Sequence, residues 1–255
     1  MKILLVADLH YDLKQFDWLL EEAPHYDLVV VAGDLLDVGS LASADAQIVV
    51  IRTYLQRLAR RSKVVVCSGN HDLDATIGGE KYAAWFDLLD QFKICRDGQN
   101  LFCGDDLISA LPWWDGAQTK EALVHQIQQD ANLKREGGRW IWVHHAPPAD
   151  SGLSWGGSRF FGDKNLVELI AEHQPDAVLS GHVHQAPFIA DGTWADRIGE
   201  TWCFNMGKQI GDVPSHIALN FTLGEAVWMS MAGPEMVSLN DTKPPQSLMA
   251  LPAWI

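Results

Sequence analysis

Six short apolar runs, rich in β-branched residues, recur between residues 3 and 179 and restrict the fold more than any other feature of the sequence. They are Ile3–Ala7, Leu28–Ala32, Val64–Cys67, Leu107–Leu111, Trp140–Val143 and Ala177–Leu179. The first three and the last are almost wholly apolar and do not alternate with polar residues, which is typical of strands buried on both faces. The sequence therefore predicts a sheet that is covered on both sides.

Between these runs, apolar residues recur at the spacing of helix turns. The four stripes are Phe16, Leu19, Leu20 and Ala23; Ile48, Ile51, Leu55 and Leu58; Val124, Ile127 and Ala131; and Leu166, Leu169 and Ile170. Strands that alternate with helices predict an α/β sheet with the helices outside. After Pro187 the helical spacing stops, and the runs Thr201–Asn205, His216–Leu223 and Ala226–Met231 are consistent with a second sheet packed on the first.

The length of 255 residues and the hydrophobic content of 47% suit one domain with a full core. No linker or repeat divides the chain, so we expect a single domain over residues 1–255. Its end, from about residue 233 to residue 255, carries Pro244, Pro245 and Pro252 and is expected to form an extended C-terminal tail.

The charge of the chain restricts its partners. With 19 basic and 33 acidic residues, the formal net charge is −14, which repels DNA and anionic membranes. No basic stripe compensates for it, so neither nucleic acid nor a membrane is expected as a partner. The N-terminal apolar run is too short for a secretion signal, and the four cysteines form no closely spaced pair. We therefore expect a cytoplasmic protein.

Side chains able to bind metal follow five of the buried runs. They are Asp8 with His10, Asp34, Asn70, one of the pair His144 and His145, and His182 with His184. In an open α/β sheet, functional groups gather beyond the carboxyl ends of the strands. Residues two apart in an extended segment point the same way, so each of the two spaced pairs can hold one ion.

The donors in this set are nitrogen and oxygen only, which suits Zn, Fe, Mn, Co or Ni rather than a structural thiolate site. Seven ligands are too many for one ion and suit two ions that share a carboxylate. Asp34 is the expected bridge, because a bridging ligand must be anionic and central. The glycines before Asp34 and Asn70 are expected to let the backbone turn sharply and bring both side chains close to the ions.

In this order, the residues resemble the calcineurin-like metallophosphoesterase superfamily. The matching blocks are Asp8-Leu9-His10, Gly33-Asp34, Gly69-Asn70-His71-Asp72, His144-His145 and Gly181-His182-Val183-His184. The resemblance implies a four-layer α/β/β/α sandwich with the metal ions between the loops of two sheets. It assigns Asp8, His10 and His184 to one ion, and Asn70, His182 and one histidine of the 144–145 pair to the other. Asp34 bridges the two ions in this assignment.

The histidine pair leaves two alternatives. Counting from the end of the preceding strand favours His144 as the ligand, whereas counting back from Pro147 favours His145. We expect His144 to bind the metal and His145 to face the substrate.

The predicted function is a dinuclear phosphoesterase that hydrolyses a small phosphomonoester or phosphodiester with a metal-activated hydroxide. His71 resembles the non-ligand catalytic histidine of the family and is expected to act either as the general acid for the leaving group or as a hydrogen-bond donor to the transition state. Asp72 is expected to hold the other ring nitrogen of His71, unless it caps a loop. Trp113, after a strand, and Arg159, in a glycine-rich loop, are candidates for substrate contacts, with simple surface packing as the alternative.

Two other functions are compatible with the same fold. A nuclease would need a basic groove, and the sequence shows none. A non-catalytic metal-binding scaffold should lack some of the ligands or His71, and this chain has all of them.

Overall fold

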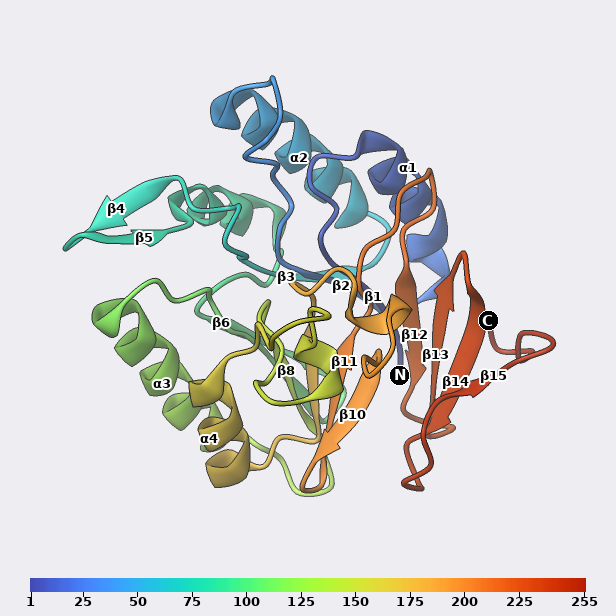
Figure 1. Cartoon of the computed structure of the whole chain (residues 1–255). Coiled ribbons are helices and arrows are strands. Elements are labelled where there is room, and N and C mark those ends of the chain that lie inside the picture. The colour runs from blue at the N-terminus through green and yellow to red at the C-terminus, as the bar shows by residue number, and fades with distance from the viewer.

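Two stacked β-sheets form the centre of the molecule in a computed structural model that describes all residues 1–255 (Figure 1). The strands of the first sheet are β1 (Lys2–Val6), β2 (Leu28–Ala32), β3 (Lys63–Cys67), β12 (His216–Asn220), β13 (Glu225–Ser230), β14 (Gly233–Ser238) and β15 (Gln246–Ser247). Their order across the sheet is β15-β14-β13-β12-β1-β2-β3. Strands β1, β2 and β3 are parallel, and β12 pairs antiparallel with β1.

The second sheet has six strands in the order β10-β11-β9-β8-β7-β6. They are β6 (Gln99–Cys103), β7 (Asp106–Ala110), β8 (Trp140–Val143), β9 (Ala177–Ser180), β10 (Ala195–Ile198) and β11 (Thr201–Asn205). Strands β7, β8, β9 and β11 run parallel to one another. A separate hairpin of β4 (Ala75–Ile77) and β5 (Glu80–Tyr82) projects at the left of Figure 1.

Helices cover the outer face of each sheet. The first sheet is covered by α1 (Leu13–Glu22), α2 (Ala44–Leu58) and the 3₁₀ segment η2 (Ala84–Phe92), and the second by α3 (Ala117–Ala131) and α4 (Lys164–His173). Three further single 3₁₀ turns are η1 (Ala23–His25), η3 (Gly152–Ser154) and η4 (Ala186–Phe188). Asp12 and Ser43 accept hydrogen bonds from backbone N–H groups of the first turns of α1 and α2, which fixes where these helices begin.

Strand residues divide between two buried environments, as alternation in a strand requires. In β1, Ile3 and Leu5 belong to a core between the sheets, whereas Leu4 and Val6 pack with α1 and α2. In β8, Ile141 faces the other sheet, and the flanking tryptophans pack with α3 and α4. The four-layer α/β/β/α sandwich implied by the family resemblance is confirmed. The expectation that the strands after Pro187 form the second sheet is wrong, because β12 and β13 complete the first sheet and only β10 and β11 join β6–β9 in the second.

The prediction of an extended tail from about residue 233 is wrong for residues 233–238. Gly233–Ser238 form β14, which pairs antiparallel with β13, and Val237 is buried in the core between the sheets. Gly and Pro residues usually indicate the end of a strand, but Gly233 and Pro234 occupy the first positions of this one, where a proline is tolerated.

None of the helices is both long enough and apolar enough to cross a membrane.

Candidate metal centre and active site

The loops that follow β1, β2, β3, β8 and β9 meet between the two sheets. The loops after β1 and β2 are joined by backbone hydrogen bonds from Asp8 N to Gly33 O, at 3.1 Å, and from His10 N to Asp34 O, at 2.9 Å. The loop after β9 joins them through His182, whose backbone N–H donates to Asp8 Oδ2 at 2.9 Å. Because these strands are parallel within each sheet, their carboxyl ends deliver the loops to one edge.

Four of the predicted ligands form a tight cluster. The donor atoms of Asp8, His10, Asp34 and His184 lie within 4.8 Å of one another. His10 Nε2 and His184 Nε2 are 3.1 Å apart, and His184 Nε2 lies 3.2 Å from Asp8 Oδ1. Imidazole nitrogens and carboxylate oxygens that converge in this way can share a cation.

Asp34 lies at the middle of the cluster. Its Oδ2 atom is 3.2 Å from His145 Nε2, 3.7 Å from His10 Nε2 and 3.9 Å from His71 Nε2. The other carboxylate oxygen, Oδ1, accepts the backbone N–H of His71 at 2.9 Å. The carboxylate is therefore fixed by one oxygen and presents the other to several histidines.

Two glycines are needed for this close approach. Gly33 has φ +87°, and a Cβ atom there would lie 2.4 Å from His145 Nδ1. A Cβ atom on Gly69 would lie 2.2 Å from Asp34 Oδ1. Any side chain at either position would push a predicted ligand away from the cluster.

Several ligand positions also have a backbone conformation that is rare for residues other than glycine. The φ angles are +56° at Asp8, +42° at His10, +54° at Asp34 and +72° at His182. Left-handed conformations of this kind are concentrated at functional sites, where the surrounding structure holds them in place. Here, the hydrogen bonds between the loops supply that support.

The histidine pair is arranged opposite to our expectation. His145 is fully buried, donates from Nδ1 to Ala32 O at 2.7 Å, and directs Nε2 toward Asp34. His144 Nε2 instead lies 3.8 Å from Asp163 Oδ2, at the start of α4. Val143 faces the other sheet, so the next side chain on that face is His145, and His144 points to the helices with Trp142. The geometry thus disagrees with His144 as the ligand.

The remaining predicted ligands are His182, beside His145, and Asn70 in the loop after β3. The ring of His182 lies 5.1 Å from the ring of His145, measured between centroids. Asn70 Oδ1 and His145 Nε2 are buried and have no hydrogen-bond partner. Buried polar atoms are rarely left in this state, so each is available for a ligand that the side chains do not provide.

The charge distribution at the site favours a cation. Burial opposes a charge on His145, but Asp34 and Asp8 outweigh it and raise the pKa of the imidazole to about 10. Burial lowers the pKa of His10 to about 4, helped by Lys208, and burial likewise lowers the pKa of His182 to about 4, helped by His145. The carboxylates of Asp8 and Asp34 attract positive charge, and the neutral imidazoles of His10 and His182 have lone pairs that can bind a cation. The residues of the site therefore fit divalent metal ions.

The environment of His71 differs from our expectation. Its ring is packed edge-on to that of His10, with centroids 4.5 Å apart, and its Nδ1 atom faces the backbone N–H of Val38 at 3.5 Å. Asp72 does not contact the His71 ring and is fully buried. Its carboxyl group instead accepts the backbone N–H groups of Leu35, Leu36 and Gly69, at 2.9 to 3.0 Å. Asp72 therefore clamps two loops together, which was the alternative role considered for it.

Two residues near the cluster were not predicted. Asp37 lies beside His71 and His10, with donor atoms of all three within 4.8 Å of one another. It follows Asp34 by three residues in the same loop, and this spacing was the available signal. Lys208 donates from Nζ to Asp8 O at 2.5 Å, although it lies 200 residues further along the chain, and no local pattern marks it.

The two predicted substrate contacts lie in different environments. The ring of Trp113 is 5.7 Å from the ring of His145 and 5.2 Å from that of His182, between centroids, so it borders the cluster. Arg159 is exposed, and its guanidinium lies 4.5 Å from the centre of the Phe161 ring. Arg159 is thus placed on the glycine-rich loop and does not belong to the cluster.

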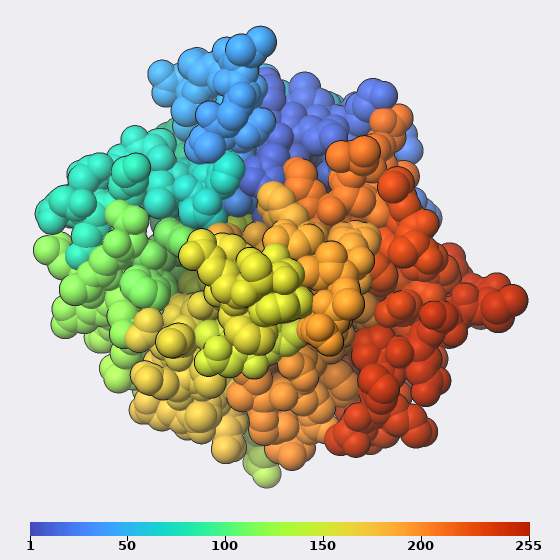
Figure 2. Space-filling view, viewed as in Figure 1, coloured from blue at the N-terminus to red at the C-terminus, as the bar shows by residue number.

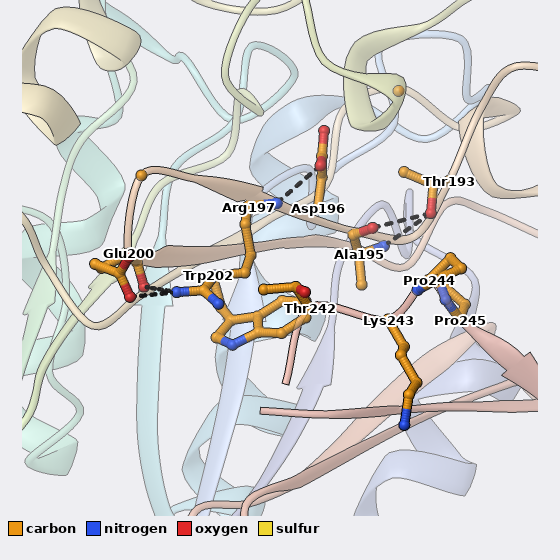
Figure 3. A pocket seen from close by; sticks show the side chains of 12 residues that line it. Thr193, Ala195, Asp196, Arg197, Glu200, Trp202, Thr242, Lys243, Pro244 and Pro245 are labelled. Atoms are coloured by element: carbon orange, nitrogen blue, oxygen red, sulfur yellow. Dashed lines mark hydrogen bonds and ion pairs between the residues drawn. The ribbon is translucent and has the colours of Figure 1, made fainter. Parts of the chain in front are cut away.

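Another hollow of about 510 Å³ lies between the β10–β11 hairpin and residues 242–245 (Figure 3). Its charged side chains are already paired, because Arg197 contacts Glu200 at 2.6 Å and Asp196 accepts the hydroxyl of Ser151 at 2.6 Å. None of the predicted ligands lines this hollow. The clustered histidines and carboxylates therefore remain the candidate active site.

Comparisons with known proteins agree with this fold. A family profile described as calcineurin-like phosphoesterase matches residues 1–186. The crystal structure of TT1561 from Thermus thermophilus superimposes with a TM-score of 0.57 at 15% identity, covering 93% of this chain and 98% of that one. Purple acid phosphatase PPD1 from yellow lupin (Lupinus luteus) seeds gives a TM-score of 0.54 at 14% identity, over 96% of this chain and 52% of that one. No curated protein sequence matches the chain.

Proposed function

Because this chain belongs to the calcineurin-like phosphoesterase family, we propose that it hydrolyses a small phosphomonoester or phosphodiester with the help of two divalent metal ions. The observation that carries the proposal is the convergence of Asp8, His10, Asp34 and His184 within 4.8 Å, with His145 Nε2 3.2 Å from the Asp34 oxygen that also faces His10. These groups come from loops of both sheets.

The ligands divide into two sets around Asp34. Asp8, His10 and His184 lie in mutual contact and would hold one ion. His145 and its neighbour His182, together with the unpartnered Asn70 Oδ1, would hold the other. Asp34, which faces His10 and His145 with the same oxygen, would bridge the two ions. His145 replaces His144 in this assignment because His145 points to the carboxylate of Asp34, whereas His144 points to that of Asp163.

Divalent ions bound in this way supply Lewis acidity that activates water and neutralises charge on phosphoryl oxygens. The residues of the chain supply orientation and a proton. His71 Nε2 is directed to the site, 3.9 Å from Asp34 Oδ2. As an imidazolium, His71 would donate the Nε2 proton to the departing oxygen and become a neutral imidazole, with Asp37 rather than Asp72 as the nearby carboxylate.

A small substrate is favoured over a polyanion. The net charge of −14 opposes the approach of long nucleic acids, whereas the positive charge of bound ions acts at short range on a single phosphate.

Metal content and activity test the proposal together. The purified protein, loaded with Mn²⁺ or Zn²⁺, should contain about two ions per chain by elemental analysis and hydrolyse p-nitrophenyl phosphate or bis(p-nitrophenyl) phosphate. Chelation should abolish turnover, and readdition of the ion should restore it. Full turnover in chelator by metal-free protein would overturn the proposed function.

A further inference from the structure

A hollow of about 530 Å³ opens beside the candidate metal centre, within the range of roughly 300 to 1,000 Å³ usual for small-molecule sites. Its walls include Trp113, Trp114, Ala146, Phe161 and Asp163. In Figure 2 the yellow segment around residue 160 stands out from the middle of the face, and the green segments that follow β7 lie to its left. The hollow is thus formed by three segments that are separate in the sequence, residues 113–115, Ala146 and residues 161–165.

This hollow shares a wall, Trp113, with the surroundings of the metal centre. Trp113 belongs to both, because it lines the hollow and its ring lies 5.2 Å from the ring of His182. Ala146, which also lines the hollow, directly follows His145. The backbone N–H of Trp113 donates to Ser68 Oγ at 3.0 Å, which ties this wall to the loop that carries Asn70. A phosphoester held at the centre could therefore extend its organic group into the hollow.

Aromatic side chains line the hollow, and neighbouring side chains hold the indole of Trp114 in place. Trp114 Nε1 donates to Asp163 Oδ2 at 2.7 Å, and the other oxygen of Asp163 accepts the backbone N–H of Asn165 at 2.7 Å. Lys120 donates to Asn165 Oδ1 and lies over the Trp114 ring, 5.8 Å from its centroid. Fixed aromatic side chains bind a flat ring at little cost in conformational entropy.

Phe161 forms the exposed side of the hollow. It is 38% exposed, and the guanidinium of Arg159 covers its ring at 4.5 Å from the centroid. An exposed phenylalanine on the rim, opposite fixed tryptophans, leaves apolar surface that a bound ring would bury.

We propose that this hollow binds the leaving group of the phosphoester, and that the preferred leaving group is a planar aromatic ring system. The inference rests on the proposed phosphoesterase function of the metal centre. It explains why Trp113 borders the ligands His145 and His182 on one side and opens onto an aromatic-walled space on the other.

The test compares 2-naphthyl phosphate with phenyl phosphate, because their leaving groups have similar acidity and differ mainly in aromatic area. In the metal-loaded wild type, kcat/KM should be roughly five- to tenfold higher for the naphthyl ester, as expected for stacking on an aromatic wall. Phe161→Leu should remove most of this preference. The matched control is Phe160→Leu, in the same loop, because Phe160 is 45% exposed, packs on Trp155 and does not line the hollow.

A binding measurement separates this inference from the proposed function. Calorimetric titration with 2-naphthylphosphonate and phenylphosphonate should show the same preference and the same loss in Phe161→Leu, without any turnover. Trp114→Phe, which keeps a ring but loses the bond to Asp163, provides a second variant and should weaken the preference. Equal kcat/KM for the two esters, or equal losses in the two phenylalanine variants, would overturn the aromatic site. Phosphonate binding with the expected preference, but no hydrolysis of either ester or of bis(p-nitrophenyl) phosphate, would instead overturn the phosphoesterase function.

Discussion

His145 is held at one nitrogen of its ring, since Nδ1 donates to Ala32 O at 2.7 Å, whereas Nε2, 3.2 Å from Asp34 Oδ2, has no hydrogen-bond partner. A backbone carbonyl on one nitrogen selects the tautomer that leaves the other free to bind a metal. His144, its neighbour, is equally buried but is directed to Asp163. The two histidines thus form a natural matched pair for mutation.

His145→Asn should weaken binding of the second metal ion by at least about 10- to 100-fold, the loss found when even a supporting partner of a metal site is removed. His144→Asn should leave both ions bound, because the His144 ring points away from the carboxylates of Asp8 and Asp34. Metal affinity measured by competition with a chromophoric chelator decides between them. The opposite ranking of the two variants would restore His144 as the ligand.

His71 borders the cluster without joining it, since its Nε2 atom lies 3.9 Å from Asp34 Oδ2 and its side chain remains partly exposed. This position suits a proton donor. We expect His71→Asn to retain both ions and to lower turnover by roughly 10²–10⁴-fold for alkyl phosphates, whose leaving groups need a proton. The loss should be smaller for nitrophenyl esters, which depart readily as anions. Steady-state rates across a series of leaving groups measure this difference, and equal losses across the series would exclude His71 as the acid.

The loops after β2 and β3 depend on Asp72, whose carboxyl group receives three backbone N–H groups from both loops. Burial raises the pKa of Asp72 to about 8, and the negative charge of Asp34 contributes to the same shift. The side chain therefore joins the segment that carries Asp34 to the segment that carries Asn70. Its removal should affect the metal centre through the backbone.

Asp72→Ala should lower the free energy of unfolding by about 2–4 kcal/mol, because buried N–H groups would lose their acceptor. Metal affinity should fall with it, and the remaining activity should fall equally for alkyl and nitrophenyl esters. Asp74→Ala is the matched control, since Asp74 is exposed two positions further along the same loop. Chemical denaturation gives the stability. A loss confined to alkyl esters would instead mean that Asp72 acts through His71.

At the scale of the whole molecule, the packing of the first sheet against helix α1 buries a histidine, His216. His216, in β12, packs against Trp18 of α1 with ring centroids 4.5 Å apart and donates from Nδ1 to Pro214 O at 2.8 Å. Burial lowers the pKa of His216 from 6.5 to about 4. Its neutral form is thus favoured in the folded protein, and acid should destabilise the fold at this place.

Because the folded pKa is below the unfolded one, this contribution to stability is complete above pH 6.5 and is lost as the pH falls toward 4, by up to about 3 kcal/mol. His216→Gln should flatten the dependence of the unfolding free energy on pH in this range, whatever its effect at neutral pH. His125→Gln, on the exposed face of α3, should leave the slope of the wild type. The comparison is made by urea denaturation at several pH values, and identical slopes in both variants would contradict the role of His216.

The buried strands and nearly all residues of the candidate metal cluster could be predicted from the sequence alone, whereas the division of the strands between the two sheets could not. Apolar runs without alternation indicate strands buried on both sides, and ligand-type residues follow five of the six runs, from Asp8 to His184. These signals are local, since they depend on hydrophobicity and on spacing within a few residues.

Only the tertiary structure decided which way side chains point and which distant groups they meet. Both faces of β8 are apolar, so no pattern in the sequence distinguishes the face of His144 from that of His145. In the same way, Asp37 rather than Asp72 lies beside His71, and Lys208 reaches Asp8 across 200 residues, because separate loops are brought together by the packing of two sheets. The physical reason is that sequence patterns report burial, whereas orientation depends on the partner that each face of a strand finds after the chain has folded.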